Sequence, residues 1–230
     1  MSRARDNANL GAQAGSGLDA SDITTGVLPV GVTGGSGLTR SNLWMKTSTG
    51  SEDFTVPAGI TKIWVTACAG GAGADQATWA QGAGSGAWCM DCECSVTPTA
   101  VLSMTVGAGG VRISGSETGG TTSIASMITL TGGTTGAVLG DVTNSWNGGT
   151  ASTSTGFVSG LLGNGHAGDH SSHAQAGTSD GGHTPFGLSS RGMNDTSHTD
   201  TVSGYGAGGG AEYNGNYGAS GGQGFIKVEY

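Results

Sequence analysis

Glycine supplies 48 of the 230 residues, roughly three times its usual share of ~7%. Because glycine loses more backbone entropy on folding than any other residue, an ordered chain of this kind must recover that loss through dense packing or hydrogen bonding. Only 10% of the residues are charged, whereas disordered chains carry many charges. We therefore expect a folded chain that shares its core between copies in a tightly packed homo-oligomer.

Two fibrous classes of glycine-rich protein fit the sequence poorly. Collagen needs glycine at every third residue and many prolines, but the chain has no sustained Gly-X-Y period and contains 4 prolines. A silk-like or cell-wall protein needs a fixed repeat length, and here hydrophobic runs interrupt the glycine at irregular intervals.

The charge distribution argues against nucleic-acid binding. The formal net charge is −8, and the 8 basic residues are scattered, so no patch fits a phosphate backbone. The start, MSRARDNANLGAQAGSG, lacks the apolar core of a signal peptide, and no window approaches a membrane span. We expect synthesis in the cytoplasm, release by another route such as cell lysis, and no embedding in a membrane.

Residues 1–45 are predicted to form a separate, extended trimerisation segment. They are polar, with short apolar beads and neither helical nor strand periodicity. Such a segment cannot bury a core alone, but three copies winding together could share one. A flexible N-terminal tail is the alternative.

Residues 46–230 are predicted to form an all-β domain, because from Phe54 onward short apolar runs alternate with polar residues at the period of a strand. Further strands are expected at 101–106, 121–124, 127–131 and 224–230, with a turn at 96–99. No amphipathic helix is apparent. The expected fold is a small antiparallel β-sandwich-like domain with long glycine-rich loops, assembled as an intertwined homotrimer.

Two of these strands define which residues should face the core. In the first, Ile63, Val65 and Ala67 alternate with polar or larger neighbours. In the second, alternation places two sets on opposite faces: Trp88, Met90, Cys92, Cys94 and Val96 on one, and Cys89, Asp91 and Glu93 on the other.

Glycine-rich stretches fill much of the remaining chain. Residues 148–204 are mostly Gly, Ser, Thr, His and Asn, and we expect them to form long exposed loops. Gly215, Gly218, Gly221 and Gly224 recur at every third residue, which is the period of a polyproline-II strand. This spacing predicts polyglycine-II segments whose glycine faces pack closely together.

Four stretches occur in a recognisable order: FTVPAGITKIWVTACAGGAGA, GAGSGAWCMDCECSVTPTAVLSMTVGAGG, GGTTSIASMITLTGG, and GYGAGGG followed by GGQGFIKVEY. Together they resemble the glycine-rich C-terminal domain of bacteriophage and prophage tail-fibre proteins. That family typically shows a VPAGVT-like start, a VTPG turn, a TVTVGAGG strand end and a final apolar strand. Upstream, DITTGVLPVGVTGGSGLT is similar to the ITTGTLPVARGGTG segment of fibre shafts. The resemblance covers most of residues 20–133 and 204–230.

The resemblance implies a structural, non-enzymatic virion protein, commonly trimeric. Its N-terminal segment would bind phage tail proteins, and its tip would bind a host cell-surface glycan or an outer-membrane protein. Related adhesin tips stack polyglycine-II strands and expose variable loops. This chain departs from the family because Ala, Ser, Thr and Trp dilute its glycine stretches, which disfavours a full polyglycine lattice. Residues 160–200 are also unusually rich in histidine.

The candidate binding residues lie in the polar C-terminal half. Receptor-binding candidates are side chains that can stack on sugars or exchange hydrogen bonds, namely Trp146, Asn164, His166, His170 and His173. The three histidines, near Asp169, could hold a divalent transition metal, especially if repeated around a trimer axis. Exposed loop histidines without a metal are the alternative, and His183 and His198 are not expected to contribute. No other cofactor is expected.

The cysteines, Cys68, Cys89, Cys92 and Cys94, are expected to be small buried hydrophobes. On a regular strand, Cys89 and Cys92 would point to opposite faces, which disfavours a zinc site. A disulfide could form after lysis if Cys68 lies beside Cys89 or Cys94 on a neighbouring strand.

The sequence shows no catalytic motif. It has no G-x-S-x-G nucleophile elbow and no phosphate-binding loop, and Asp91 with Glu93 is too generic a pair to indicate glycosidase chemistry. Two alternatives to a receptor-binding fibre stay open. One is a structural tail connector or decoration protein. The other is a polysaccharide-degrading tailspike. Such an enzyme would usually need a long β-helix with facing carboxylates, but this chain carries only 16 acidic residues.

Overall fold

The computed structural model describes residues 40, 42–74, 82–111, 118–135, 147–169, 178–190, 202–212 and 218–230. The chain divides into two compact units, Met1–Asn42 and Leu43–Tyr230, and the second is described below. Most of the predicted extended segment, residues 1–45, lies outside the described residues. The part of the chain that the structure describes contains no helix able to cross a membrane.

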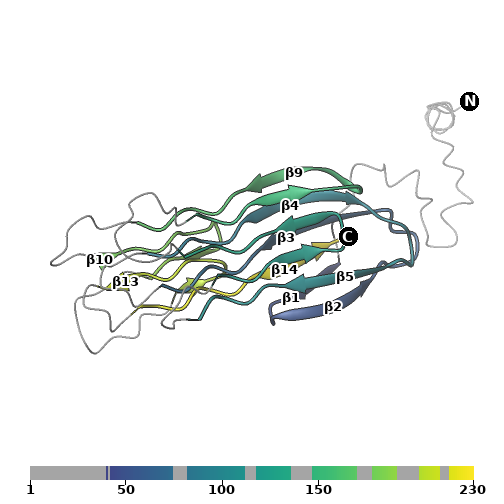
Figure 1. The fold of residues 1–230 in the computed structure, drawn as a ribbon. Coiled ribbons are helices and arrows are strands. Elements are labelled where there is room, and N and C mark those ends of the chain that lie inside the picture. The colour runs from purple at the N-terminus through teal and green to yellow at the C-terminus, as the bar shows by residue number, and fades with distance from the viewer. Residues whose placement is uncertain are drawn as a thin grey trace, which may run out of the picture. The chain divides into compact units, whose positions relative to one another are not determined.

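Two five-stranded antiparallel sheets lie face to face at one end of the second unit (Figure 1). The first sheet has the strand order β1 (Leu43–Lys46), β14 (Phe225–Glu229), β3 (Lys62–Cys68), β4 (Trp88–Ser95) and β9 (Phe157–Gly163). The second has the order β2 (Gly50–Thr55), β5 (Val101–Val106), β6 (Thr122–Ile124), β7 (Ile128–Leu130) and β8 (Ala151–Thr153). Two short antiparallel pairs complete the fold: β10 (Thr178–Ser179) with β13 (Ala211–Glu212), and β11 (Gly187–Leu188) with β12 (Ser203–Gly204).

The two sheets bury a single hydrophobic cluster between them. From β3, Ile63, Val65 and Ala67 are fully buried, as their alternation predicts, and they belong to the same cluster as Met104 and Ile128 of the second sheet. Each large apolar side chain buried in this way contributes about 1.5–3 kcal/mol. The predicted all-β, antiparallel, sandwich-like fold is confirmed.

A β-bulge in β4 changes which cysteines face the core. Cys89 pairs with Ala67 and Cys92 pairs with Val65. The two residues between the cysteines, Met90 and Asp91, therefore lie opposite one residue of β3, Thr66. The second of them, Asp91, adopts a φ of 55° and donates its N–H to Thr66 Oγ1 at 3.2 Å. The extra residue shifts the alternation by one position. The expectation that Cys89 and Cys92 face opposite ways is therefore wrong, and both are fully buried in the core.

All four cysteines are buried free thiols, which confirms their interpretation as small hydrophobes. Burial raises the pKa of Cys68 and of Cys94 to about 12. Hydrogen bonding to Cys92, together with burial, raises the pKa of Cys89. Cys68 lies opposite Trp88, whereas Cys89 lies opposite Ala67 on the other face of the sheet, so this register does not place Cys68 beside Cys89.

Residues 148–204, which the sequence predicts to be loops, contain β8 and β9. These strands form one edge of each sheet, and β1 and β2 form the other edges. In β9 the central residues are exposed, so the sequence lacks the alternation that identifies a half-buried strand. β1 was missed for a similar reason, because Leu43 and Met45 are exposed apolar residues.

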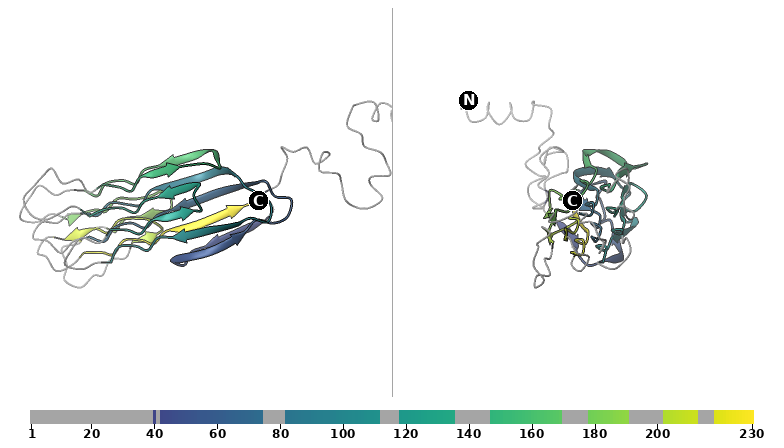
Figure 2. Two further views of the ribbon diagram at one scale, coloured as in Figure 1. Left: turned by 45° about the vertical axis from the view of Figure 1, so that its right-hand side comes forward. Right: turned by 60° about the vertical axis from the view of Figure 1, so that its left-hand side comes forward.

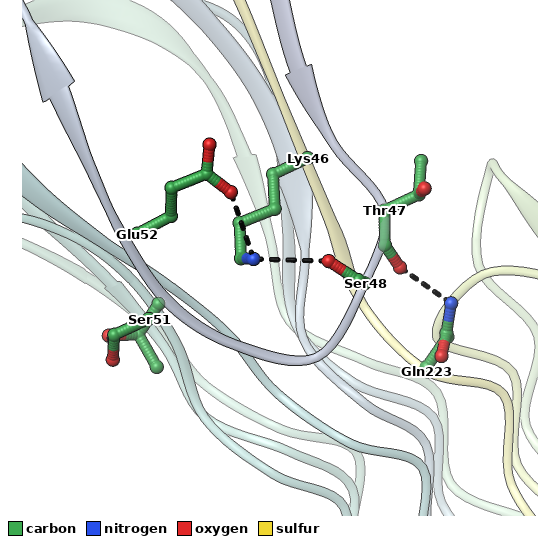
Figure 3. A network of polar contacts seen from close by, with 7 residues as sticks. Lys46, Thr47, Ser48, Ser51, Glu52 and Gln223 are labelled. Atoms are coloured by element: carbon green, nitrogen blue, oxygen red, sulfur yellow. Dashed lines mark hydrogen bonds and ion pairs between the residues drawn. The ribbon is translucent and has the colours of Figure 1, made fainter.

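A buried lysine supports the connection between the two sheets (Figure 3). Lys46, at the end of β1, is buried, and its Nζ lies 3.2 Å from Glu52 Oε2 on β2. The same Nζ donates to Ser48 Oγ at 3.1 Å. Gln223 Nε2 donates to the Thr47 carbonyl oxygen at 2.6 Å, which ties this connection to the segment that leads into β14.

Beyond the sandwich, strands of both sheets continue as glycine-rich extended segments (Figures 1 and 2). The first sheet continues into residues 69–74, 82–87, 164–169 and 218–224, and the second into 107–111, 118–121, 131–135 and 147–150. Residues 180–183 and 205–210 run beside them, joined by backbone hydrogen bonds. We call these segments together the lattice.

Hydrogen bonds in the lattice repeat every three residues. Along residues 82–87, N–H groups three positions apart donate to the same neighbouring segment, and consecutive ones donate to three different segments. The acceptors, in order, are the carbonyl oxygens of Asp169, Gly209, Thr134, His166, Gly206 and Thr131, at 2.8–3.1 Å. A β-strand would direct its hydrogen bonds to two sides only, whereas three residues per turn is the geometry of polyproline II. The predicted polyglycine-II packing is present.

Glycine is required where segments touch through their backbones. A Cβ added to Gly70 or Gly71 would lie 1.9 or 2.0 Å from a carbonyl oxygen of a neighbouring segment. The predicted three-residue glycine repeat faces the backbone of a neighbouring segment. Added Cβ atoms on Gly221 and Gly224 would lie 2.1 and 2.3 Å from the carbonyl oxygens of Gly71 and Cys68, whereas one on Gly218 would lie 3.1 Å from that of Ala74, again at intervals of three along the neighbouring segment. Gly215 lies outside the described residues.

Alanine does not prevent the lattice from forming, contrary to the expectation that dilution of the glycine disfavours it. Ala72, Ala74, Ala83 and Ala211 are buried together in a second, smaller hydrophobic cluster. Their methyl groups pack against one another. Only the positions that face a neighbouring backbone must be glycine.

We expect Gly221→Ala to destabilise the fold by roughly 3 kcal/mol, because the added Cβ would lie 2.1 Å from Gly71 O and a backbone must shift. Gly218→Ala, on the same segment, is the matched control, with its shortest contact at 3.1 Å. It should be close to neutral, because alanine also loses less entropy on folding. Urea denaturation of both variants measures the difference. Equal unfolding free energies would contradict the close backbone contact.

Candidate functional site

Five stretches of the sequence connect neighbouring segments of the lattice. Each stretch follows a described segment that leads away from the sandwich and precedes a described segment that leads back toward it. They are residues 75–81, 112–117, 136–146, 170–177 and 213–217, and all lie outside the described residues. The candidates Trp146, His170 and His173 fall in these segments. Of the candidate binding residues, the structure therefore describes Asn164 and His166.

Asn164 has a structural contact. Its side chain is exposed, and its Oδ1 accepts a hydrogen bond from the Ala151 N–H at 3.2 Å. This bond ties the end of β9 to the beginning of β8, where both strands merge into the lattice. A receptor could reach the remaining amide donors, but the carbonyl oxygen already has a partner.

His166 stacks on His183, a residue that the sequence analysis set aside. The two rings are 4.7 Å apart between centroids, with an angle of 17° between their planes. Both side chains are exposed. The rings come from two lattice segments, 164–169 and 180–183, that each hydrogen-bond to residues 82–87. The lattice therefore pairs His166 with His183, whereas the sequence predicts a cluster of His166 with His170 and His173.

A buried serine fixes the backbones of both histidines. Ser85 is fully buried, and its Oγ accepts a hydrogen bond from the His166 N–H at 2.7 Å. The same hydroxyl lies 3.1 Å from the His183 carbonyl oxygen, to which it donates. Its own N–H donates to the His166 carbonyl oxygen at 2.9 Å. One serine among glycines and alanines thus holds two segments in register.

The two histidines belong to a larger pattern that we call the His–Asp ladder, made of His166, Asp169, Asp180 and His183. One segment reads HAGD and its antiparallel neighbour reads DGGH. The Asp169 N–H donates to the Asp180 carbonyl oxygen at 2.8 Å, so the aspartates lie side by side as the histidines do. At about 3.1 Å per residue, positions three apart point the same way at a spacing of about 9 Å. All four side chains are exposed.

The ladder is chemically suited to binding. Its imidazoles can donate or accept hydrogen bonds and can ligate metals, and its carboxylates accept hydrogen bonds. Among the described residues, no group of three or more His, Cys, Asp or Glu side chains has the geometry to hold a metal ion. In the sequence, the ladder corresponds to the motif H-x-x-D followed by the same motif in reverse order, D-x-x-H. These motifs predict paired side chains only where the two segments are known to be antiparallel and to have a period of three residues.

The family model described as a glycine-rich domain matches residues 46–230. The chain belongs to this glycine-rich domain family. No curated protein matches the chain. The glycine-rich domain thus covers both the sandwich and the lattice, including the His–Asp ladder.

Ser85→Ala should destabilise the glycine-rich domain by about 1–3 kcal/mol, because the His166 N–H and the His183 carbonyl oxygen lose the buried Ser85 hydroxyl as a partner. Thermal or urea unfolding gives the global change, and amide hydrogen exchange at His166 gives the local one. Ser159→Ala, at an exposed position on β9, is the control and should leave both unchanged. Protection of the His166 amide in Ser85→Ala equal to wild type would show that the serine does not fix this segment.

Proposed function

We propose that this glycine-rich domain protein is a non-enzymatic, structural virion subunit: a bacteriophage tail fibre whose lattice end recognises and binds the host surface. One observation carries the proposal. In five places a described lattice segment that leads away from the sandwich is followed along the chain by one that leads back, and the lattice is held together largely by backbone hydrogen bonds. Surface segments that carry recognition are typically placed by a rigid scaffold.

The lattice suits this role because its contacts depend little on side chains. Most of the hydrogen bonds between segments join backbone groups, so the connecting segments can differ in sequence without altering the scaffold. The net charge of −8 implies that general attraction to an anionic cell surface does not supply the affinity. Binding to a host glycan or outer-membrane protein would then rest on specific short-range contacts.

The fibre would attach to phage tail proteins through the segment predicted over residues 1–45, of which Leu43–Met45 belong to β1, and would be made in the host cytoplasm before it joins the virion. The resemblance of DITTGVLPVGVTGGSGLT to fibre-shaft segments supports this orientation. The proposal assigns the protein no nucleic-acid partner and no catalytic role. A tail connector or decoration protein, and a polysaccharide-degrading tailspike, are the competing functions that the experiments below separate.

Attachment is tested by replacing residues 136–146 and 170–177 with Gly-Ser linkers of the same lengths. The lattice residues 147–169 stay intact, so the protein should fold with an unchanged melting temperature while particles that carry it lose or change host-strain adsorption. The matched control inserts Gly-Ser residues into the turn at 97–99, at the sandwich end, and should adsorb normally.

Normal adsorption by a folded replacement variant would reject the tip assignment and favour the connector function. Release of sugar fragments from host polysaccharide by the purified wild-type protein would instead favour a tailspike.

We also propose that the fibre is a homotrimer. Exposed apolar side chains on both edge strands of the first sheet support shared burial: Leu43 and Met45 on β1, and Val158 and Leu161 on β9. Multi-angle light scattering of the full chain should give three times the chain mass of 22.3 kDa. A stable particle of a single chain mass would contradict the trimer without affecting the attachment test.

A further inference from the structure

We propose that His166 and His183 together form a binding site for a divalent transition-metal ion of the zinc, nickel or copper class. The site differs from a cluster of His166 with His170 and His173, because its second ligand comes from another lattice segment. It does not depend on the attachment function, since it is a property of the folded glycine-rich domain.

The geometry brings two metal-ligating groups together on a fixed support. The ring centroids are 4.7 Å apart, and both rings are exposed, so a small rotation about their side-chain bonds can direct one nitrogen of each toward a shared ion. Metal–imidazole bonds of about 2.0–2.1 Å require such a close pair. Ser85 holds the two backbones through its buried hydroxyl, so the pair does not have to be ordered by the metal itself.

The donor atoms select the class of ion. Imidazole nitrogen suits zinc, nickel and copper, whereas calcium and magnesium prefer oxygen ligands. The carboxylates of Asp169 and Asp180 are about 9 Å along the ladder, too far to ligate the same ion, but their negative charge favours a cation nearby. Two protein ligands leave coordination positions that water or a bound polar molecule can fill.

The test uses the full chain in metal-free buffer, titrated separately with Ni²⁺ and Zn²⁺ by isothermal titration calorimetry. We expect one ion per chain and a rise in melting temperature, with no comparable effect of Ca²⁺. His183→Gln and His166→Gln should each weaken binding by about tenfold or more. His183→Phe keeps an aromatic ring for stacking but no ligand, so it should fold normally and lose binding to the same extent.

Three control variants, His170→Gln, His173→Gln and His198→Gln, should retain binding of the metal ion. An unchanged affinity in His183→Phe would overturn the proposal, as would the absence of any Ni²⁺ or Zn²⁺ binding by the wild-type chain. Loss of binding in His170→Gln or His173→Gln with full binding in His183→Gln would also overturn it and place the ion in the segment after Asp169. Circular dichroism without metal confirms that each variant is folded.

Discussion

Direct backbone contact between the two layers of the glycine-rich domain is the interaction on which the rest of the structure depends. In the sandwich, side chains keep facing sheets about 10 Å apart. Where the same layers continue into the lattice, their backbones hydrogen-bond to each other, as Gly70 N–H does to Gly120 O at 3.0 Å and Gly133 N–H does to Gly70 O at 3.0 Å. A Cβ at Gly70 or Gly133 would lie 1.9 or 2.0 Å from a carbonyl oxygen of a neighbouring segment, and one at Gly120 would lie 2.6 Å from the Ala108 backbone nitrogen. The glycine content is therefore the condition for closing the gap between layers.

The buried hydroxyl group of Thr122 hydrogen-bonds to both layers at the point where the sandwich ends and the lattice begins. Thr122, in β6, donates from its Oγ1 to the Cys68 carbonyl oxygen at 2.9 Å and accepts from the Gly107 N–H at 3.0 Å. Cys68 ends β3 of the first sheet, and Gly107 follows β5 of the second, so one side chain bridges both layers at the point where they converge. The hydroxyl thus hydrogen-bonds to buried backbone groups of both layers. Folding of the two parts is coupled through the strands that run through both.

The central strands were predictable from the sequence and the edge strands largely were not, for a physical reason. β3, β5 and β7 each have neighbours on both sides and a buried face, which produces the alternation that sequence analysis detects. β1 and β9 each have one strand neighbour and expose much of their apolar surface, so they leave no such pattern. The bulge at Asp91 is a local insertion that alternation cannot anticipate. The pairing of His166 with His183 requires the register of two lattice segments, which no spacing within one segment reveals.

The lattice also sets a rule for how binding residues can be arranged on it. Since its period is three, side chains on one segment point the same way only at every third position, and an antiparallel neighbour must carry the inverted order to match. HAGD against DGGH satisfies this rule, with a serine below in place of the usual glycine or alanine. Outward positions such as Asp169 and His183 do not face a neighbouring backbone, so they are free of the constraint that fixes the glycines. Such a scaffold can therefore change what it binds while its fold stays the same, which is the property that a host-recognition tip would need.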